Sequence, residues 1–376
     1  MAYSKGMVNR QRLTNLLIDL CATDSGSRKE RLMADKLKAM LADLGFLVTE
    51  DSAGEKVGGG DAGNLYGRLQ GTGEGQPLLF SSHMDRVTPG FGVKPRIEGN
   101  YLKSDGATIL GADDAAGLAA ILEAVQVLRE RKLPHPTIEI AFTICEEVGL
   151  LGAKHVDETW FQSKLGFVLD SSGPVGEITV KSPHSAKISA TFKGKAAHAG
   201  VAPEKGISAV QMASVAVSRM KLLRIDAETT ANIGSLVAEG PTNIVPETCK
   251  LMGETRSLNR EKLDAQIAHM TEALESAARE FGGSVEVDVT RAYMGLDLGP
   301  DSPAVARAMR AAELIGVAPS LASSGGGSDA NIFNAKGIQT AVLGVGYEEI
   351  HSTKEQMPLD QLEALAEWTL AIILGD

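Results

Sequence analysis

The hydrophobic and polar positions in the first half of the chain alternate between helix-like and strand-like patterns. Leucine and methionine recur at helical spacing over 28–44, and Gly45 follows as a residue that commonly ends a helix. A second helical stripe covers 114–129. Short apolar runs that fit buried strands lie at 77–82, 137–144 and 165–170. This alternation predicts an α/β fold in which helices cover both faces of a mostly parallel sheet.

The pattern changes after about residue 182. The expected elements are a strand at 186–194, a helix at 208–223, strands at 232–240 and 249–259, a helix at 261–281 and a strand at 284–293. Their order, β-α-β-β-α-β, is the ferredoxin-like arrangement. Past residue 293 the α/β pattern resumes, with a helix at 303–314 and a strand at 339–345.

Chain length supports a division into two domains. At 376 residues the chain exceeds the size at which a single hydrophobic core usually stops growing. We therefore predict a catalytic metal-binding domain made of 1–181 and 294–376. An inserted α+β domain at 182–293 would act as a lid and dimerisation domain.

Composition restricts the class of partner. The hydrophobic content of 43% and charged content of 23% are ordinary for a globular protein, and the net charge of −11 argues against nucleic acid or an anionic membrane as partner. No apolar run reaches the roughly 18 residues that a membrane span needs, and the N-terminus lacks a signal-peptide core. The three cysteines are far apart, which excludes a disulfide framework and suits a reducing cytosol. We expect a cytoplasmic protein.

Polar residues follow the predicted strands at the points where these strands end. The groups are His83-Met84-Asp85 after the first strand, Glu146-Glu147 after the second, Asp170 at the end of the third, and Asp113-Asp114 at the start of a helix. Each group alone has an ordinary explanation, as a surface pair, a helix cap or a turn. In a parallel sheet, however, the carboxyl ends of the strands meet in one crevice, where ligands bind.

Such a cluster of carboxylates would repel itself unless cations were bound within it. A pair of divalent ions is the simplest solution, because one aspartate can bridge two ions about 3.5–4 Å apart. In His83-x-Asp85 the two side chains leave the chain on the same side, so the Asp85 carboxylate can accept the imidazole N–H and orient the other nitrogen toward a metal. The two adjacent glutamates point in different directions, so one can bind metal while the other faces the water.

The chain resembles the cocatalytic zinc peptidases, the family that includes carboxypeptidase G, aminoacylase and peptidase T. The stretches that carry the resemblance are SSHMDRV, LGADDAAG, ICEEVGLLGA, FVLDSSGPVGEI, KAAHAGVAPEKG, TNIVPETCKLMGETR and GVGYEEIHSTKE. They run in family order from about residue 80 to the C-terminus. The LGADD and GPVGEI runs are most similar to peptidase T, which cleaves tripeptides with a free amino terminus. After His351 the chain reads Ser-Thr-Lys-Glu, where peptidase T carries a glycine and a second histidine.

The resemblance implies a site for two divalent ions. The implied ligands are His83 and Asp170 for one ion, Glu147 and His351 for the other, and Asp113 as the bridge. Two histidine ligands favour zinc, with cobalt or manganese as alternatives, over magnesium.

Five further residues receive roles from the same resemblance. Asp85 would orient His83, and Glu146 would be the general base that activates a metal-bridging hydroxide. On the inserted domain, His198 would stabilise the oxyanion. Asn243 and Arg256 would hold the substrate, and the Arg256 guanidinium suits a carboxylate.

Three functions fit this set of residues. The first is a tripeptide-aminopeptidase-like hydrolase that acts on short peptides. The second is a deacylase or carboxypeptidase that acts on N-acyl amino acids or dipeptides, and the third is a non-catalytic binding protein on the same scaffold. The complete set of candidate ligands argues against the third. The resemblance also suggests a homodimer formed through the lid domain.

Overall fold

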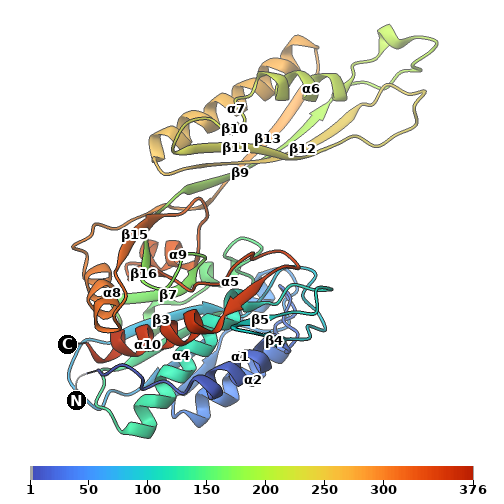
Figure 1. Ribbon diagram of the computed structural model, residues 1–376. Helices are drawn as coiled ribbons and strands as arrows, with labels where there is room; N and C mark the ends of the chain where they lie inside the picture. The colour runs from blue at the N-terminus through green and yellow to red at the C-terminus, as the bar shows by residue number, and fades with distance from the viewer. Residues whose placement is uncertain (1–2, 376) are drawn as a thin grey trace. The chain divides into compact units, whose positions relative to one another are not determined.

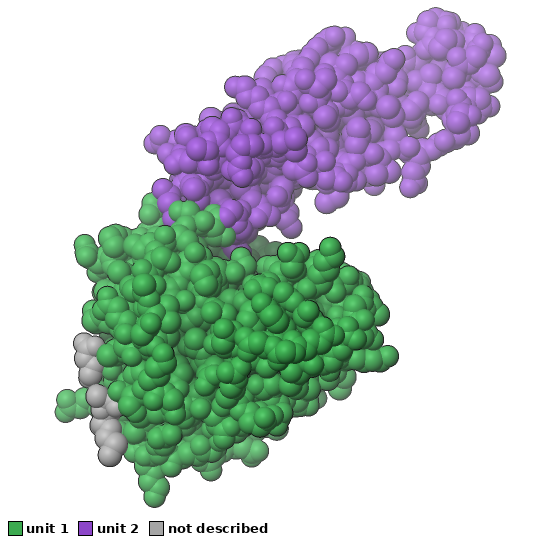
Figure 2. All heavy atoms as spheres, viewed as in Figure 1, with its two compact units in different colours: residues 1–180, 297–324, 328–376 green, residues 181–296, 325–327 purple. Residues whose placement is uncertain are grey.

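The structure, a computed structural model, describes residues 3–375 and divides into two compact units (Figure 2). Unit 1 consists of the described residues up to Val180, of Asp297–Ser324 and of the residues from Ser328 onward. Unit 2 consists of Lys181–Leu296 and the short glycine segment Gly325–Gly327. The predicted limits at 182 and 293 lie close to these boundaries, but the glycine segment was not expected in the smaller unit.

The larger sheet has nine strands, in the order β1-β2-β6-β3-β7-β16-β8-β14 with β15 against β8. The strands are β1 (Leu47–Glu50), β2 (Leu65–Leu69), β3 (Leu78–His83), β6 (Ile138–Thr143), β7 (Leu165–Ser171), β8 (Glu177–Ser182), β14 (Leu296–Asp297), β15 (Ser320–Ser323) and β16 (Gln339–Gly344). The four central strands β6, β3, β7 and β16 are parallel, whereas β1, β2 and β8 pair antiparallel. The predicted α/β fold with a parallel centre is confirmed, and its antiparallel edges are an addition.

Helices pack on the larger sheet and on one another (Figure 1). They are α1 (Arg10–Cys21), α2 (Arg31–Asp43), α3 (Ala53–Lys56), α4 (Ala112–Arg131), α5 (Leu151–Lys154), η1 (Glu158–Trp160), α8 (Pro303–Leu314), α9 (Asp329–Ala335) and α10 (Leu359–Leu374). The main core lies between the sheet and α1, α2, α4, α8 and α10, and α9 packs against β7 and β16 outside that core. A small third sheet joins β4 (Arg96–Glu98), β5 (Tyr101–Lys103) and β17 (Gln356–Pro358).

α4 is buried on nearly every side, which the predicted apolar stripe did not anticipate. It lies against β3 and β7 and is covered by α1 and α10. Its sequence is rich in alanine, and small side chains let neighbouring elements approach on all sides. α4 therefore holds the residues at its N-terminus in a fixed position next to the ends of β3 and β7.

Unit 2 is a five-stranded antiparallel sheet in the order β10-β11-β12-β9-β13, against which two helices pack. Its elements are β9 (His184–Lys193), η2 (Pro203–Lys205), α6 (Ala209–Arg219), β10 (Leu223–Arg224), β11 (Thr229–Val237), β12 (Thr248–Ser257), α7 (Arg260–Glu280) and β13 (Ser284–Tyr293). The predicted β-α-β-β-α-β order is present, with the two-residue β10 added. The separate core of this unit includes Phe192, Met212 and Leu274.

The helix expected at 28–44 begins three residues later, at Arg31. Arg28 has φ +70°, a left-handed conformation that cannot continue into a helix. α1, α10 and the β1–β2 pair were not predicted. No helix in the described part of the chain has the length and apolar character needed to cross a membrane.

Candidate metal centre

The candidate centre lies at the carboxyl ends of three neighbouring parallel strands. β3 ends at His83, which pairs with Thr143 at the end of β6, and Asp170 lies near the end of β7. Because β3 pairs with both β6 and β7, the residues that follow these strands meet at one edge of the sheet.

The Asp113 carboxylate lies between two histidines. Its Oδ1 is 3.2 Å from Nε2 of His83, and its Oδ2 is 3.1 Å from Nε2 of His351. Asp113 and His83 are buried, whereas about half of the His351 side chain is exposed. A carboxylate that directs one oxygen toward each of two imidazoles has the orientation that a ligand shared by two cations needs.

Each histidine also has a second carboxylate nearby. Oδ1 of Asp170 is 3.8 Å from Nε2 of His83, and Oε1 of Glu147 is 3.0 Å from Nε2 of His351. The ligand atoms of His83, Asp113 and Glu147 all lie within 4.8 Å of one another. The structure therefore brings the five predicted ligands together as two histidine–carboxylate pairs joined by Asp113.

Asp114 lies in the same cluster, but both of its carboxylate oxygens accept hydrogen bonds from neighbouring residues. Its ligand atom lies within 4.8 Å of those of His83 and Asp170. However, its Oδ2 accepts hydrogen bonds from the Ser82 hydroxyl and, at 3.2 Å, from the backbone N–H of His83. Its Oδ1 accepts from the N–H of Gly117 at 3.3 Å. These contacts distinguish it from the preceding aspartate, whose two oxygens face histidines.

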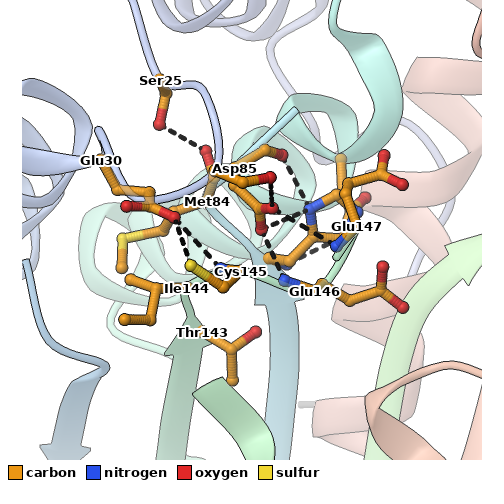
Figure 3. A network of polar contacts seen from close by, with 12 residues as sticks. Ser25, Glu30, Met84, Asp85, Thr143, Ile144, Cys145, Glu146 and Glu147 are labelled. Carbon is orange, nitrogen blue, oxygen red and sulfur yellow. Dashed lines mark hydrogen bonds and ion pairs between the residues drawn. The ribbon is translucent and has the colours of Figure 1, made fainter. Parts of the chain in front are cut away.

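Asp85 contacts both His83 and the turn that follows β6. Its backbone carbonyl accepts the Nδ1–H of His83 at 2.8 Å, whereas its nearest carboxylate oxygen is 3.6 Å from that nitrogen. The carboxylate instead accepts from the N–H of Glu146 at 2.8 Å, the N–H of Glu147 at 3.3 Å and the Ser27 hydroxyl at 2.6 Å (Figure 3). The carbonyl therefore makes the closer contact to the imidazole, and the carboxylate mainly fixes the turn.

Glu146 presents a carboxylate that no other group in the described part of the chain holds. Among residues 3–375 its side chain makes no hydrogen bond or ion pair, and Figure 3 shows it extending away from Asp85. Burial, followed by the negative charge of Asp170, raises the pKa of Glu146 well above its usual value. A carboxylate with these properties is suited to accepting and returning a proton.

The electrostatics of the cluster favour bound cations. Burial raises the pKa of Asp170 well above its usual value. Burial would also raise the pKa of Asp113, but hydrogen bonds with His351 and His83 lower it. Hydrogen bonds with Asp113 and Glu147 raise the pKa of His351 to about 10. Imidazole nitrogens and carboxylate oxygens at such short range are the ligands that zinc, cobalt and manganese bind in proteins, so this donor set fits divalent metal ions.

Two of the remaining predicted residues are adjacent in unit 2. The N–H of Ala199 donates to the carbonyl of Asn243 at 2.8 Å, and His198 forms a β-bridge with Ile244. The side chains of His198 and Asn243 are both exposed. Nδ1 of His198 accepts the N–H of Gly200 at 3.2 Å, which leaves Nε2 as the protonated nitrogen of the neutral ring.

Arg256, the third predicted residue of unit 2, is bonded to a carboxylate of the protein itself. Its Nε and Nη2 donate to the two carboxylate oxygens of Glu254 at 3.0 and 3.1 Å, a bidentate pair. Its Nη1 is 3.5 Å from the carbonyl oxygen of Gly325. The roles assigned to His198, Asn243 and Arg256 stay predictions.

Comparison with protein families gives a match over most of the chain. Residues 79–375 match the model of peptidase family M20/M25/M40. The chain belongs to this family. It is a metallopeptidase, and the predicted resemblance to the peptidase T branch is confirmed by the relatives of this M20 chain.

Similar sequences cover nearly the whole M20 chain. The Bacillus subtilis protein YqjE is 47% identical over 367 residues, which is 98% of this chain and 99% of that protein. Peptidase T of Geobacillus kaustophilus is 28% identical over 337 residues, which is 88% of this chain and 80% of that peptidase.

Solved structures agree with this assignment. The aminopeptidase PepT of Bacillus cereus ATCC 10987 superposes with a TM-score of 0.89 at 48% identity, covering 98% of this chain and 99% of that one. A tripeptidase from Staphylococcus aureus gives a TM-score of 0.93 at 42% identity, with 98% of both chains covered. The YXEP protein of Bacillus subtilis, a dinuclear metal-binding M20 peptidase, shares the fold at a TM-score of 0.72 and 19% identity.

Glu355, which the sequence did not identify, is a buried carboxylate that supports the candidate metal centre. It accepts hydrogen bonds from the N–H groups of Leu110 at 2.9 Å, Gly111 at 2.8 Å and Asp113 at 3.1 Å. Gly111 has φ +74°, and a Cβ there would lie 2.8 Å from the guanidinium carbon of the buried Arg86. Glu355 therefore fixes the loop that carries the bridging candidate.

Tyr347 is a second neighbour that the sequence did not identify. Its buried hydroxyl donates to Oδ1 of Asp170 at 3.2 Å. Both Tyr347 and Glu355 belong to the GVGYEEIHSTKE stretch that carries part of the family resemblance. Their proximity to His351 in the sequence was the available indication of a role.

We predict that Glu355→Ala weakens metal binding by about 10–100-fold, the usual effect of removing a group that orients a metal ligand. The substitution leaves three N–H groups of the Asp113 loop without their acceptor. Competition with a chelating dye measures the affinity. Glu348→Ala is the matched control, because Glu348 is exposed and bonds to the side chain of Gln356. Unchanged metal affinity in a folded Glu355→Ala protein would contradict the prediction.

Proposed function

We propose that this M20 peptidase is a tripeptide aminopeptidase that uses two divalent metal ions to remove the N-terminal residue of short peptides. The observation that carries the proposal is the Asp113 carboxylate between His83 and His351. The Glu146 carboxylate, which is unbonded among residues 3–375, lies in the same cluster. Similarity to an aminopeptidase and a tripeptidase at more than 40% identity supports the substrate class.

In this proposal the five clustered residues are the metal ligands. His83 and Asp170 would hold one ion, Glu147 and His351 the other, and Asp113 both. Zinc suits two imidazoles and three carboxylates, and cobalt and manganese are alternatives. When bound, the ions would supply Lewis acidity, which lowers the pKa of a water molecule from 15.7 to about 7.

Glu146 would act as general base and then as general acid. It would take a proton from the attacking water and return it to the leaving amine. Burial raises the pKa of Glu146, which favours holding the transferred proton until the leaving amine takes it. Asp85 would keep Glu146 in position, since its carboxylate accepts the Glu146 N–H at 2.8 Å.

The residues of unit 2 would bind the substrate. His198 would donate its Nε2–H to the scissile carbonyl oxygen as negative charge develops there. Asn243 would hold the peptide backbone. Arg256 would exchange its bond with Glu254 for one with the carboxylate of the peptide.

A homodimer through unit 2 and a cytoplasmic location stay predictions. β13 lies at one end of the unit 2 sheet and exposes Val289, which suits contact with a second copy of the chain. All three cysteines are buried and unbridged, consistent with a reducing compartment.

The substrate class is tested with Ala-Ala-Ala and N-acetyl-Ala-Ala-Ala, each incubated with protein reconstituted with Zn²⁺, Co²⁺ or Mn²⁺. We expect hydrolysis of the free tripeptide alone, and complete loss of activity after treatment with EDTA. Amino-acid release measured by chromatography decides the outcome. Cleavage of the acetylated peptide alone would instead assign the metal centre to a deacylase.

The adjacent glutamates provide a matched pair of variants. We expect Glu146→Gln to lower kcat by at least about 100-fold, in line with the loss of a general base, while two metal ions stay bound. Glu147→Gln should lose one ion, because that side chain is a proposed ligand. Metal content by mass spectrometry and turnover of Ala-Ala-Ala separate the two roles. Loss of both ions from the Glu146 variant would contradict the assignment.

Arg256→Lys tests recognition of the peptide carboxylate. We expect KM for Ala-Ala-Ala to rise by about 10–100-fold, because losing a charged hydrogen bond costs about 1.5–3 kcal/mol. The effect should disappear with Ala-Ala-Ala-amide, which lacks the carboxylate. Arg260→Lys, at the exposed start of α7, is the control. Equal losses on the acid and the amide would show that Arg256 does not contact the carboxylate.

A further inference from the structure

A carboxylate that the proposed reaction does not use lies behind the turn that carries Glu146. Glu30 directly precedes α2, and its side chain is fully buried. Its Oε1 accepts hydrogen bonds from the N–H of Arg28 at 2.9 Å, and from the N–H and thiol of Cys145 at 3.1 and 3.3 Å (Figure 3). In the described part of the chain its Oε2 has no hydrogen-bond partner. A buried acid with an unpaired oxygen costs stability, so its presence calls for another explanation.

The turn after β6 depends on two buried acids. Three consecutive backbone N–H groups donate to carboxylates. The N–H of Cys145 donates to Glu30, and the N–H groups of Glu146 and Glu147 donate to Asp85. Cys145 has φ +53°, in the left-handed region, which is unfavourable for a non-glycine residue. The hydrogen bond from its N–H to Glu30 holds the chain in this conformation immediately before Glu146.

Glu30 is itself fixed on a rigid segment. Its carbonyl accepts the N–H of Ala34 in the first turn of α2 at 2.8 Å. Earlier in the same segment, the Ser25 hydroxyl donates to the carbonyl of Met84 at 2.6 Å. The Ser27 hydroxyl donates to the Asp85 carboxylate, also at 2.6 Å. The segment 25–30 therefore contacts the chain after β3 and the chain after β6 at the same time.

We propose that Glu30 is a positioning residue for Glu146. By accepting the N–H of Cys145 it fixes the turn, so that the Glu146 carboxylate keeps its direction. The inference rests on the proposed role of Glu146 as general base. Glu30 itself takes no part in proton transfer, because its carboxylate is buried against Cys145 and bonds to none of the metal-ligand side chains within residues 3–375.

The test compares Glu30→Met with Glu30→Gln. Methionine has a similar length and no acceptor, and replacing a buried charge by an apolar side chain is often neutral for stability. Glutamine retains an oxygen for the Cys145 N–H. For Glu30→Met we expect kcat and kcat/KM for Ala-Ala-Ala to fall together by about 100-fold, the cost of a displacement of about 1 Å in a reacting group. KM and the content of two metal ions should stay unchanged. Glu30→Gln should remain close to wild type.

Glu367→Met is the matched control for lost amide acceptors. Glu367 lies on α10 and is also buried. It accepts hydrogen bonds from the N–H groups of Gly6 and Val8 at 2.9 and 3.0 Å. This variant should lower the melting temperature without lowering kcat.

Equal loss of kcat in the Glu30 and Glu367 variants, or wild-type kcat in Glu30→Met, would overturn the proposal. A Glu30→Gln variant as slow as Glu30→Met would also overturn it, because charge rather than the acceptor would then matter. Glu30→Leu serves as a second variant without an acceptor if the methionine protein does not fold.

The outcome separates this inference from the proposed function. Full activity of Glu146→Gln would remove the general-base role and the positioning role together. An inactive Glu146→Gln protein combined with a fully active Glu30→Met protein would overturn the role of Glu30 alone.

Discussion

The requirement to hold several carboxylates in one buried crevice governs how unit 1 is built. Asp113, Asp170 and Glu147 converge because the chain places an acid at or near the carboxyl ends of neighbouring strands and at the start of α4. Like charges at such distances in a medium of low dielectric repel strongly, and burial penalises each of them further. Two imidazoles relieve part of this repulsion, and divalent cations would relieve the rest. The position of Asp113 between two histidines is the central element of that balance.

A second group of acids performs a different task, which is to accept backbone N–H groups. Where a strand ends, its amides lose their partners in the sheet, and buried amides need other acceptors. Asp85 and Glu30 accept the three amides of the turn after β6, and Glu355 accepts three from the loop before and at Asp113. The backbone of Glu147 and of Asp113, two proposed metal ligands, is thus held by Asp85 and Glu355, which are not proposed ligands.

Locally encoded features could be predicted from the sequence, and features that depend on distant contacts could not. The bounds of α8 and β13 were predicted correctly because their periodic patterns are self-contained. The strand-end residues were found because each follows a recognisable apolar run. The start of α2 was wrong because the left-handed Arg28 is not visible in a hydrophobic pattern. A strand-edge salt bridge was an alternative for Arg256 from the sequence, but its partner Glu254 was not named, although residues two apart on a strand share a face. Glu30 was missed because its partner Cys145 lies 115 positions away.

The support supplied by Glu30 comes from outside the region that matches the family model. That region begins at residue 79, whereas the segment 25–30 precedes it. A motif describes residues whose spacing the chemistry constrains, such as the ligands at the strand ends. An acceptor for a turn amide is constrained only by the final position of its oxygen, which any rigid neighbouring segment can supply. The proposed positioning of Glu146 therefore depends on a contact between the segment before α2 and the turn after β6, which are 115 positions apart in the sequence.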